Sequence, residues 1–148
     1  MSRVLVVDDD TAVRTVIKTV LEREGFDVVL AGDGASGIAA IQLHAFDVVI
    51  VDIFMPGMDG LETIRVFNKY APSVPVIAIS GFLFRGTSAP APDFLAMATK
   101  LGAAYSLHKP FRPNDLLRVV EACLGDDDGA SGRLRTRAEP VQRKSAGP

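Results

Sequence analysis

Acidic, hydroxyl and basic side chains follow several short apolar runs of this chain, where they could share one chemical task. These side chains are Asp8, Asp9, Asp52, Ser80 and Lys109. The runs before them have strand length and are rich in Val and Ile, which is typical of strands buried in a parallel sheet. The carboxyl ends of parallel strands meet at one edge of the sheet, and open α/β sheets bind their ligands there. We therefore expect the five side chains to converge.

Three carboxylates in one pocket repel each other, and proton uptake or a bound cation must relieve that repulsion. Mg²⁺ prefers oxygen ligands and usually keeps several of its waters, so a few carboxylates are enough to hold it. With the ion in place, the ammonium of Lys109 and the hydroxyl of Ser80 could neutralise the oxygens of a phosphoryl group in transfer. The constellation predicts a magnesium-dependent phosphoryl site.

The elements that must position these side chains alternate along the chain. Expected strands cover Val4–Val7, Phe26–Ala31, Asp47–Asp52, Val74–Ile79 and Tyr105–Leu107. Apolar residues at helical spacing predict helices after each strand, at 12–24, from Gly34, around 61–67, at 93–101 and at 113–124. In the helix after Gly34, the expected inward residues are Ile38, Ile41 and Leu43. This alternation predicts a parallel sheet with helices on both faces.

Five strand–helix units favour an α/β fold of the (βα)5 doubly wound, flavodoxin-like type with three layers. The common strand order for such a sheet is 2-1-3-4-5. That order makes the first and third strands neighbours, so the Asp8–Asp9 corner would lie beside Asp52.

Composition limits the other possibilities. A chain of 148 residues with 48% hydrophobic residues can bury one core, which we expect to span residues 1–125. Residues 126–148 are poor in large apolar side chains and are expected to be a disordered C-terminal tail without an output domain. A net charge of -2 does not indicate a nucleic-acid or membrane surface. The single cysteine and the lack of a signal or spanning segment predict a cytoplasmic protein.

Four short motifs carry a resemblance to a known family. They are Val7-Asp8-Asp9, the stretch from Asp52 that ends Met-Pro-Gly-Met-Asp-Gly, Ser80-Gly81, and Lys109-Pro110-Phe111. In this order, from about Arg3 to Leu124, the chain resembles the receiver domain of two-component response regulators.

The resemblance implies that Asp52 is the phosphoacceptor, taking a phosphoryl group from a histidine kinase or a histidine phosphotransfer protein. It implies that Asp9 and Asp52 bind Mg²⁺ directly with the main-chain carbonyl of Phe54, and that Asp8 acts mainly through water. Such a protein catalyses only its own phosphorylation and dephosphorylation and is not otherwise an enzyme. The expected output is a switched surface that binds a downstream protein, from a monomer or weak dimer without direct nucleic-acid contact.

Ser80 takes the place of the family's switch hydroxyl, and Lys109 that of its invariant lysine, with a cis bond expected before Pro110. The chain also departs from the family. The usual aromatic residue three positions before the lysine is Ser106 here, and Tyr105 is expected to face the other way unless a bulge shifts the strand.

The Phe82–Pro92 loop is longer than an ordinary strand-to-helix connection. Because it directly follows the switch serine, we expect it to move on activation and to help contact a partner.

Two other functions remain open from the sequence. The first is a receiver-like interaction module that works without phosphorylation. The second is a phosphatase with a nucleophilic aspartate of the haloacid-dehalogenase type, which the Asp8-Asp9-Asp10 run suggests. That motif requires Thr at the fifth position, where this chain has Ala12. A flavin-binding module fits less well, because three aspartates would repel its phosphate.

Overall fold

The computed structural model describes residues 2–53, 60–80 and 94–125. The strands are β1 (Arg3–Val7), β2 (Asp27–Ala31), β3 (Val48–Asp52), β4 (Val76–Ser80) and β5 (Tyr105–His108). The helices are α1 (Thr11–Arg23), α2 (Gly34–Leu43), α3 (Gly60–Tyr70), α4 (Phe94–Lys100) and α5 (Pro113–Gly125). These bounds differ from the predicted ones by no more than about two residues, except that α3 continues three residues beyond the predicted end near 67.

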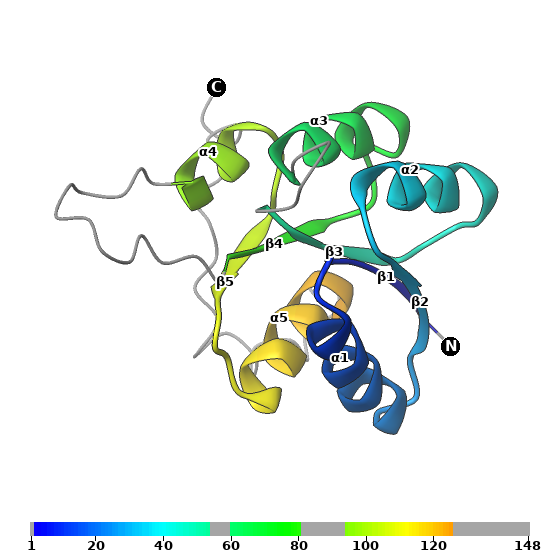
Figure 1. The fold of residues 1–148 in the computed structure, drawn as a ribbon, viewed down its shortest axis with the longest axis vertical. Helices are drawn as coiled ribbons and strands as arrows, with labels where there is room; N and C mark the ends of the chain where they lie inside the picture. The colour runs from blue at the N-terminus through cyan, green and yellow to red at the C-terminus, as the bar shows by residue number, and fades with distance from the viewer. Residues whose placement is uncertain (1, 54–59, 81–93, 126–148) are drawn as a thin grey trace, which may run out of the picture.

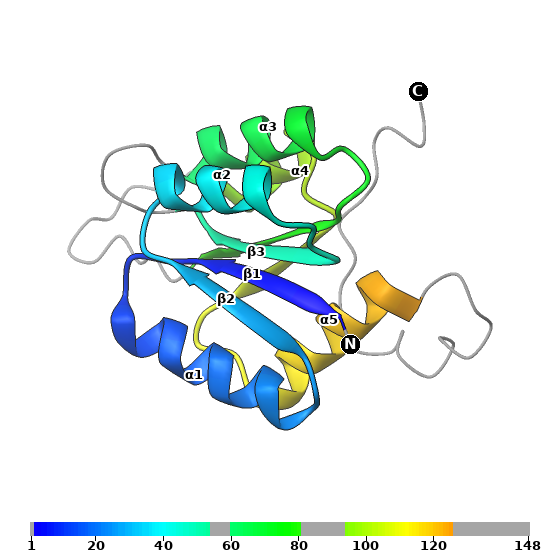
Figure 2. The same cartoon turned by 90° about the vertical axis from the view of Figure 1, so that its right-hand side faces the viewer.

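All strand pairs are parallel, and the order in the sheet is β2-β1-β3-β4-β5. Figures 1 and 2 show α1 and α5 on one face of the sheet and α2, α3 and α4 on the other. The predicted fold class and strand order are thus confirmed. Val7 pairs with Val51 in register, so β1 and β3 end side by side.

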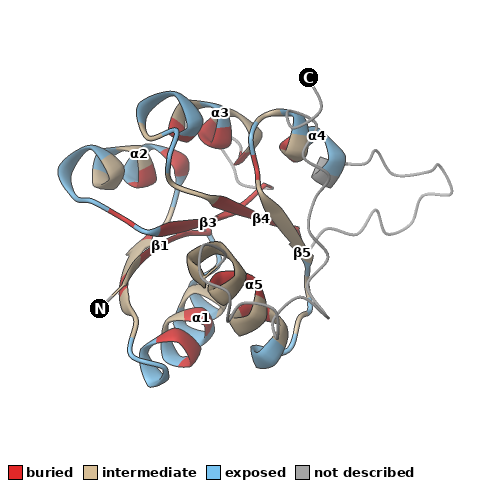
Figure 3. Ribbon diagram, turned by 180° about the vertical axis from the view of Figure 1, so that it is seen from behind, coloured by how far each residue is buried: buried red, intermediate tan, exposed pale blue. Residues whose placement is uncertain are grey.

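Each face of the sheet carries its own apolar core, because successive strand residues point to opposite faces. Toward α2, α3 and α4 the buried side chains include Leu5, Val7, Val49, Val51, Ile64 and Phe67. Toward α1 and α5 they include Val4, Val6, Ile50, Ile77, Leu21 and Leu116. Every residue of β3 and β4 is buried, as the red strands of Figure 3 show. Two-sided burial explains why these strands appear in the sequence as unbroken apolar runs.

Aspartate side chains begin two of the helices. Asp10 accepts hydrogen bonds from the main-chain N–H groups of Ala12 and Val13 at the start of α1. Asp33 accepts a hydrogen bond from the main-chain N–H of Ser36 at the start of α2. This hydrogen bond lowers the pKa of the Asp33 carboxyl. Asp10 lies three residues after β1 and Asp33 two residues after β2, so each cap sets where its strand-to-helix turn ends.

The predicted inward position of Leu43 is wrong. Ile38 and Ile41 pack against the core, but Leu43 is 76% exposed. At 3.6 residues per turn, Leu43 lies about 200° around the helix axis from Ile41 and so faces solvent. α2 also ends at this residue.

The β4–β5 register runs without interruption, from Ile77 opposite Tyr105 to Ser80 opposite His108. Tyr105 packs against the core beneath α1 and α5. Ser106 is its neighbour in a regular strand and therefore faces the α4 side. As predicted, Tyr105 does not occupy the place of the family's aromatic residue.

None of the helices in the described ranges is long and apolar enough to cross a membrane. The Phe82–Pro92 loop, Phe54 and the predicted tail lie outside the described residues.

Candidate functional site

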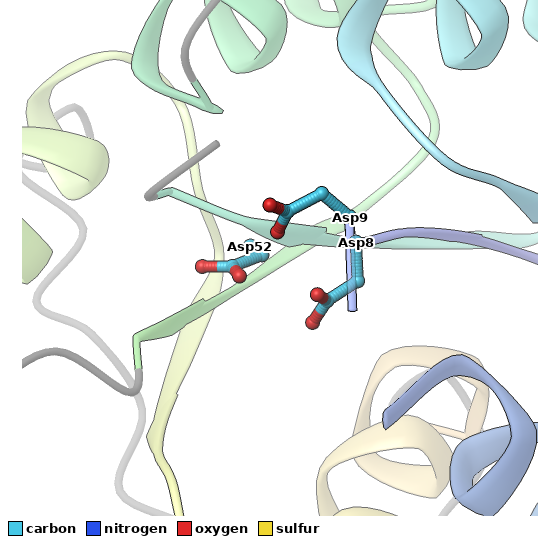
Figure 4. Close-up of side chains that lie close together, drawn as sticks. All are labelled: Asp8, Asp9 and Asp52. Atoms are coloured by element: carbon cyan, nitrogen blue, oxygen red, sulfur yellow. The ribbon is translucent and has the colours of Figure 1, made fainter. Parts of the chain in front are cut away.

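The carboxylates of Asp8, Asp9 and Asp52 gather at the carboxyl edge of the sheet. Their ligand oxygens lie within 4.8 Å of one another, and Figure 4 shows them directed beyond the ends of β1 and β3. Asp8 and Asp52 are buried, with 0% and 4% exposure, whereas Asp9 is exposed. We name these three residues the acidic triad.

Lys109 reaches the acidic triad from the end of β5. Its Nζ lies 2.9 Å from Asp8 Oδ2 and 3.2 Å from Asp52 Oδ2, so one ammonium bridges both buried carboxylates. Its main-chain N–H donates to the Ser80 carbonyl at 2.8 Å, which joins the ends of β4 and β5. The expected cis bond between Lys109 and Pro110 is present.

Burial alone would lower the pKa of the Lys109 ammonium. Hydrogen bonds and charge attraction from Asp8 and Asp52 outweigh that effect, and the net result is a raised pKa. Lys109 therefore stays charged at physiological pH and offers a fixed positive charge next to Asp52.

Asp8 is held through each of its polar groups. Its Oδ1 accepts from the N–H of Asp10 at 2.9 Å, and its own N–H donates to the carbonyl of Ala31 at 3.1 Å. Its main-chain carbonyl accepts from Nη1 of Arg14 at 2.6 Å. Sequence reasoning missed Arg14, because a side-chain bond to a main-chain oxygen has no periodic or motif signal.

Ser80 ends β4 and is 8% exposed, at the same edge of the sheet as the acidic triad. The predicted carbonyl ligand of Phe54 cannot be compared, because that residue lies outside the described ranges. The structure thus brings together Asp8, Asp9, Asp52 and Lys109 and places Ser80 on the adjoining strand end.

The donor set suits a hard divalent cation. The acidic triad offers only oxygen atoms, which Mg²⁺ prefers. Three carboxylates face one ammonium, so their formal charges leave an excess of two negative charges that a divalent ion would balance. The exposure of Asp9 leaves the cluster open on one side to an ion with its waters.

Residues 4–121 match the family model described as the response regulator receiver domain. The chain belongs to this family. The matched range includes the acidic triad and Lys109, so the site described above lies within the receiver domain.

Known receivers are similar to this chain in sequence and in fold. The DNA-binding response regulator MtrA of Mycolicibacterium paratuberculosis is 30% identical over 137 residues, covering 93% of this chain and 57% of that protein. This receiver therefore spans little more than half the length of that relative. The chemotaxis protein CheY4 of Vibrio cholerae superposes with a TM-score of 0.72 at 30% identity, covering 83% of this chain and 98% of its own.

A CheY-like receiver domain protein of Methanospirillum hungatei superposes with a TM-score of 0.77, also at 30% identity, covering 89% of this chain and 99% of its own. Family, fold and relatives together support a phosphoacceptor signalling role. They do not favour the phosphatase or the phosphorylation-independent module.

Proposed function

We propose that this receiver domain takes a phosphoryl group onto Asp52 from the phosphohistidine of a histidine kinase or phosphotransfer protein. The observation that carries the proposal is the position of the Asp52 carboxylate, 3.2 Å from the Lys109 ammonium and beside the exposed Asp9. A phosphoryl donor could approach from that open side, while the rest of Asp52 is covered by the protein.

In the transfer, a carboxylate oxygen of Asp52 attacks phosphorus as the phosphorus–nitrogen bond to the donor imidazole breaks. Lys109 neutralises charge on the transferring phosphoryl oxygens, and Ser80 donates a hydrogen bond to one of them. Asp9 and Asp52 would hold Mg²⁺ directly with the carbonyl of Phe54, and Asp8 through water. When bound, the ion supplies positive charge that screens the attacking carboxylate from the phosphate.

Phosphorylation adds negative charge and acceptor oxygens at one strand end, which draws Ser80 toward Asp52 and changes a protein-binding surface. We infer that residues 1–125 form the signalling unit, and that they act as a cytoplasmic monomer or weak dimer on a downstream protein. The relative MtrA is named as DNA-binding, but the net charge of -2 here supports output without direct nucleic-acid contact. The phenyl and leucyl side chains at 82–84 are proposed to take part in the partner contact.

The test uses acetyl phosphate and Mg²⁺, with intact-mass measurement and borohydride trapping of the acyl phosphate. We expect one added phosphoryl group in the wild type and none in Asp52→Asn. Asp10→Asn is the matched control, since Asn also caps a helix and Asp10 lies outside the acidic triad. An unmodified wild type, or a modified Asp52→Asn, would contradict the proposal.

A further inference from the structure

Arg14 lies next to the acidic triad without belonging to it. Its Nη1 donates to the main-chain carbonyl of Asp8 at 2.6 Å, and its Nη2 donates to Thr11 Oγ1 at 3.2 Å. One planar guanidinium therefore joins the end of β1 to the first residue of α1. Charge-assisted bonds of this kind are shorter and stronger than neutral ones.

Gly32, just after β2, makes room for this guanidinium. A Cβ on Gly32 would lie 3.3 Å from Arg14 Nη1 and 3.7 Å from Arg14 Cζ. Among the described glycines only Gly25 and Gly102 have positive φ, so the small size of Gly32 matters here through the space it leaves and not through its backbone conformation. The guanidinium is thus confined between two strand-to-helix turns.

The carbonyl that Arg14 holds belongs to the peptide between Asp8 and Asp9. A peptide group is planar, so fixing its oxygen fixes the plane that carries the Cα of Asp9. The N–H of Asp8 is held separately by the Ala31 carbonyl at 3.1 Å. Asp9 itself is exposed, so its direction depends on this peptide more than on packing around its side chain.

We propose that Arg14 is a positioning residue that aims the Asp9 carboxylate at the metal and phosphoryl site. This inference rests on the proposed function, since it assigns Arg14 a part in forming that same site. Arg14 acts through the Asp8–Asp9 peptide and makes no contact with the transferred group.

If Arg14 acted only through its charge, its removal would change the Mg²⁺ affinity in the opposite direction. A positive charge near three carboxylates repels a divalent cation, so removing it would strengthen Mg²⁺ binding. Removing a positioning contact weakens Mg²⁺ binding instead. The sign of the change therefore separates the two roles.

The experiment measures Mg²⁺ affinity of the full chain by isothermal titration calorimetry. We expect the Kd to rise about tenfold in Arg14→Gln and in Arg14→Lys, the usual size for residues that orient metal ligands. Lysine keeps the charge but cannot donate as a planar fork to two acceptors. Gly32→Ala should raise the Kd less, because its methyl group displaces the guanidinium by only a few tenths of an ångström.

Lys18→Gln is the matched control. Lys18 is one turn along α1 and pairs with Glu22 at the surface, so this variant removes the same charge from the same helix without touching the Asp8 carbonyl. Its Kd should equal the wild-type value. Urea unfolding of each variant gives the stability, and the Kd should change even where the unfolding midpoint does not.

Several results would overturn the inference. They are tighter binding by Arg14→Gln, or a wild-type Kd in both Arg14→Lys and Gly32→Ala. If Arg14→Gln does not fold, the other two variants still decide.

Saturating Mg²⁺ should restore phosphorylation of Arg14→Lys by acetyl phosphate, and a persistent loss would also count against positioning of a metal ligand. If the wild type is phosphorylated and the Arg14 variants bind Mg²⁺ with the wild-type Kd, only this inference is refuted. A wild type that binds no Mg²⁺ would refute the metal site as well.

Discussion

At the scale of single residues, the site depends on a charge balance between buried groups. The Lys109 side chain is 18% exposed and pairs with two aspartates whose side chains are 0% and 6% exposed. Ion pairs this deep are costly to break, because the remaining charge loses its partner without regaining water. Asp8 and Asp52 would then repel each other without the ammonium that bridges them.

Lys109→Met should therefore lower the free energy of unfolding by about 3 kcal/mol in metal-free buffer, the lower end for buried pairs because Lys109 is partly exposed. Lys18→Met, which removes an exposed pair with Glu22, should cost no more than about 0.5 kcal/mol. Urea unfolding in EDTA measures both. If both variants lose the same free energy of unfolding, the buried ion pairs of Lys109 contribute no more to stability than the exposed pair of Lys18.

The difference in free energy of unfolding between the wild type and Lys109→Met should change with pH in one direction. The pKa of Lys109 is raised in the folded chain above its ordinary value of 10.5. Its contribution to stability is therefore complete below pH 10.5 and is lost as the pH rises through the folded-state pKa. The stability gap between wild type and Lys109→Met should be constant from neutral pH up to that point and shrink above it. A gap that widens in alkali would refute the assignment.

The sequence predicted the convergence of Asp8, Asp9, Asp52 and Lys109 because each follows an apolar run whose direction and order were predictable. It did not predict Arg14, whose bond to a main-chain oxygen depends on a side-chain conformation. Nor did it reveal that Gly32 leaves space for that side chain. Such contacts become visible only when two strand-to-helix turns are placed side by side.

At the scale of elements, the first turn of α3 lies directly against the end of β3. A Cβ on Gly60 would overlap the carbonyl oxygen of Asp52 and the Cα of Ile53. Both are backbone atoms, which cannot rotate away as a flexible side chain can. The position of Asp52 is thus tied to how closely α3 approaches.

Gly60→Ala should force α3 outward and lower the free energy of unfolding by about 2 kcal/mol, as overpacking of a tight contact does. Gly125→Ala at the end of α5 is the control, since a Cβ there meets nothing within 4 Å. Urea denaturation compares the two variants. Wild-type stability in Gly60→Ala would mean that α3 can move without cost.

Helix faces were predicted well where the apolar spacing was regular and less well at helix ends. Ile38 and Ile41 lie three residues apart and both face the core, whereas Leu43 ends α2 and is exposed. A terminal apolar residue carries little periodic information, because no further turn confirms its face.

At the scale of the whole molecule, an ion bound only by the folded chain must stabilise it. The acidic triad brings Asp52 next to Asp8 and Asp9, which lie 44 and 43 positions earlier in the chain, so the unfolded chain offers no comparable site. The two-sided sheet and its covering helices are what assemble the ligand set.

Mg²⁺ at 100 times its Kd should raise the free energy of unfolding by about 2.7 kcal/mol. Asp9→Asn should lose most of this gain, while its metal-free stability changes by no more than about 0.5 kcal/mol because Asp9 is exposed. Thermal unfolding at increasing Mg²⁺ follows both proteins. Equal stabilisation of the two would place the ion elsewhere on the chain.

The bridge from Lys109 to Asp8 spans 101 positions of the chain. A nascent polypeptide still lacking residue 109 carries the acidic corner without its ammonium, however well the earlier strands have formed. The positive charge at that corner is thus added late in synthesis by the ribosome. The growing protein gains the complete set of charged groups at this corner only after all five strands of the sheet have been synthesised.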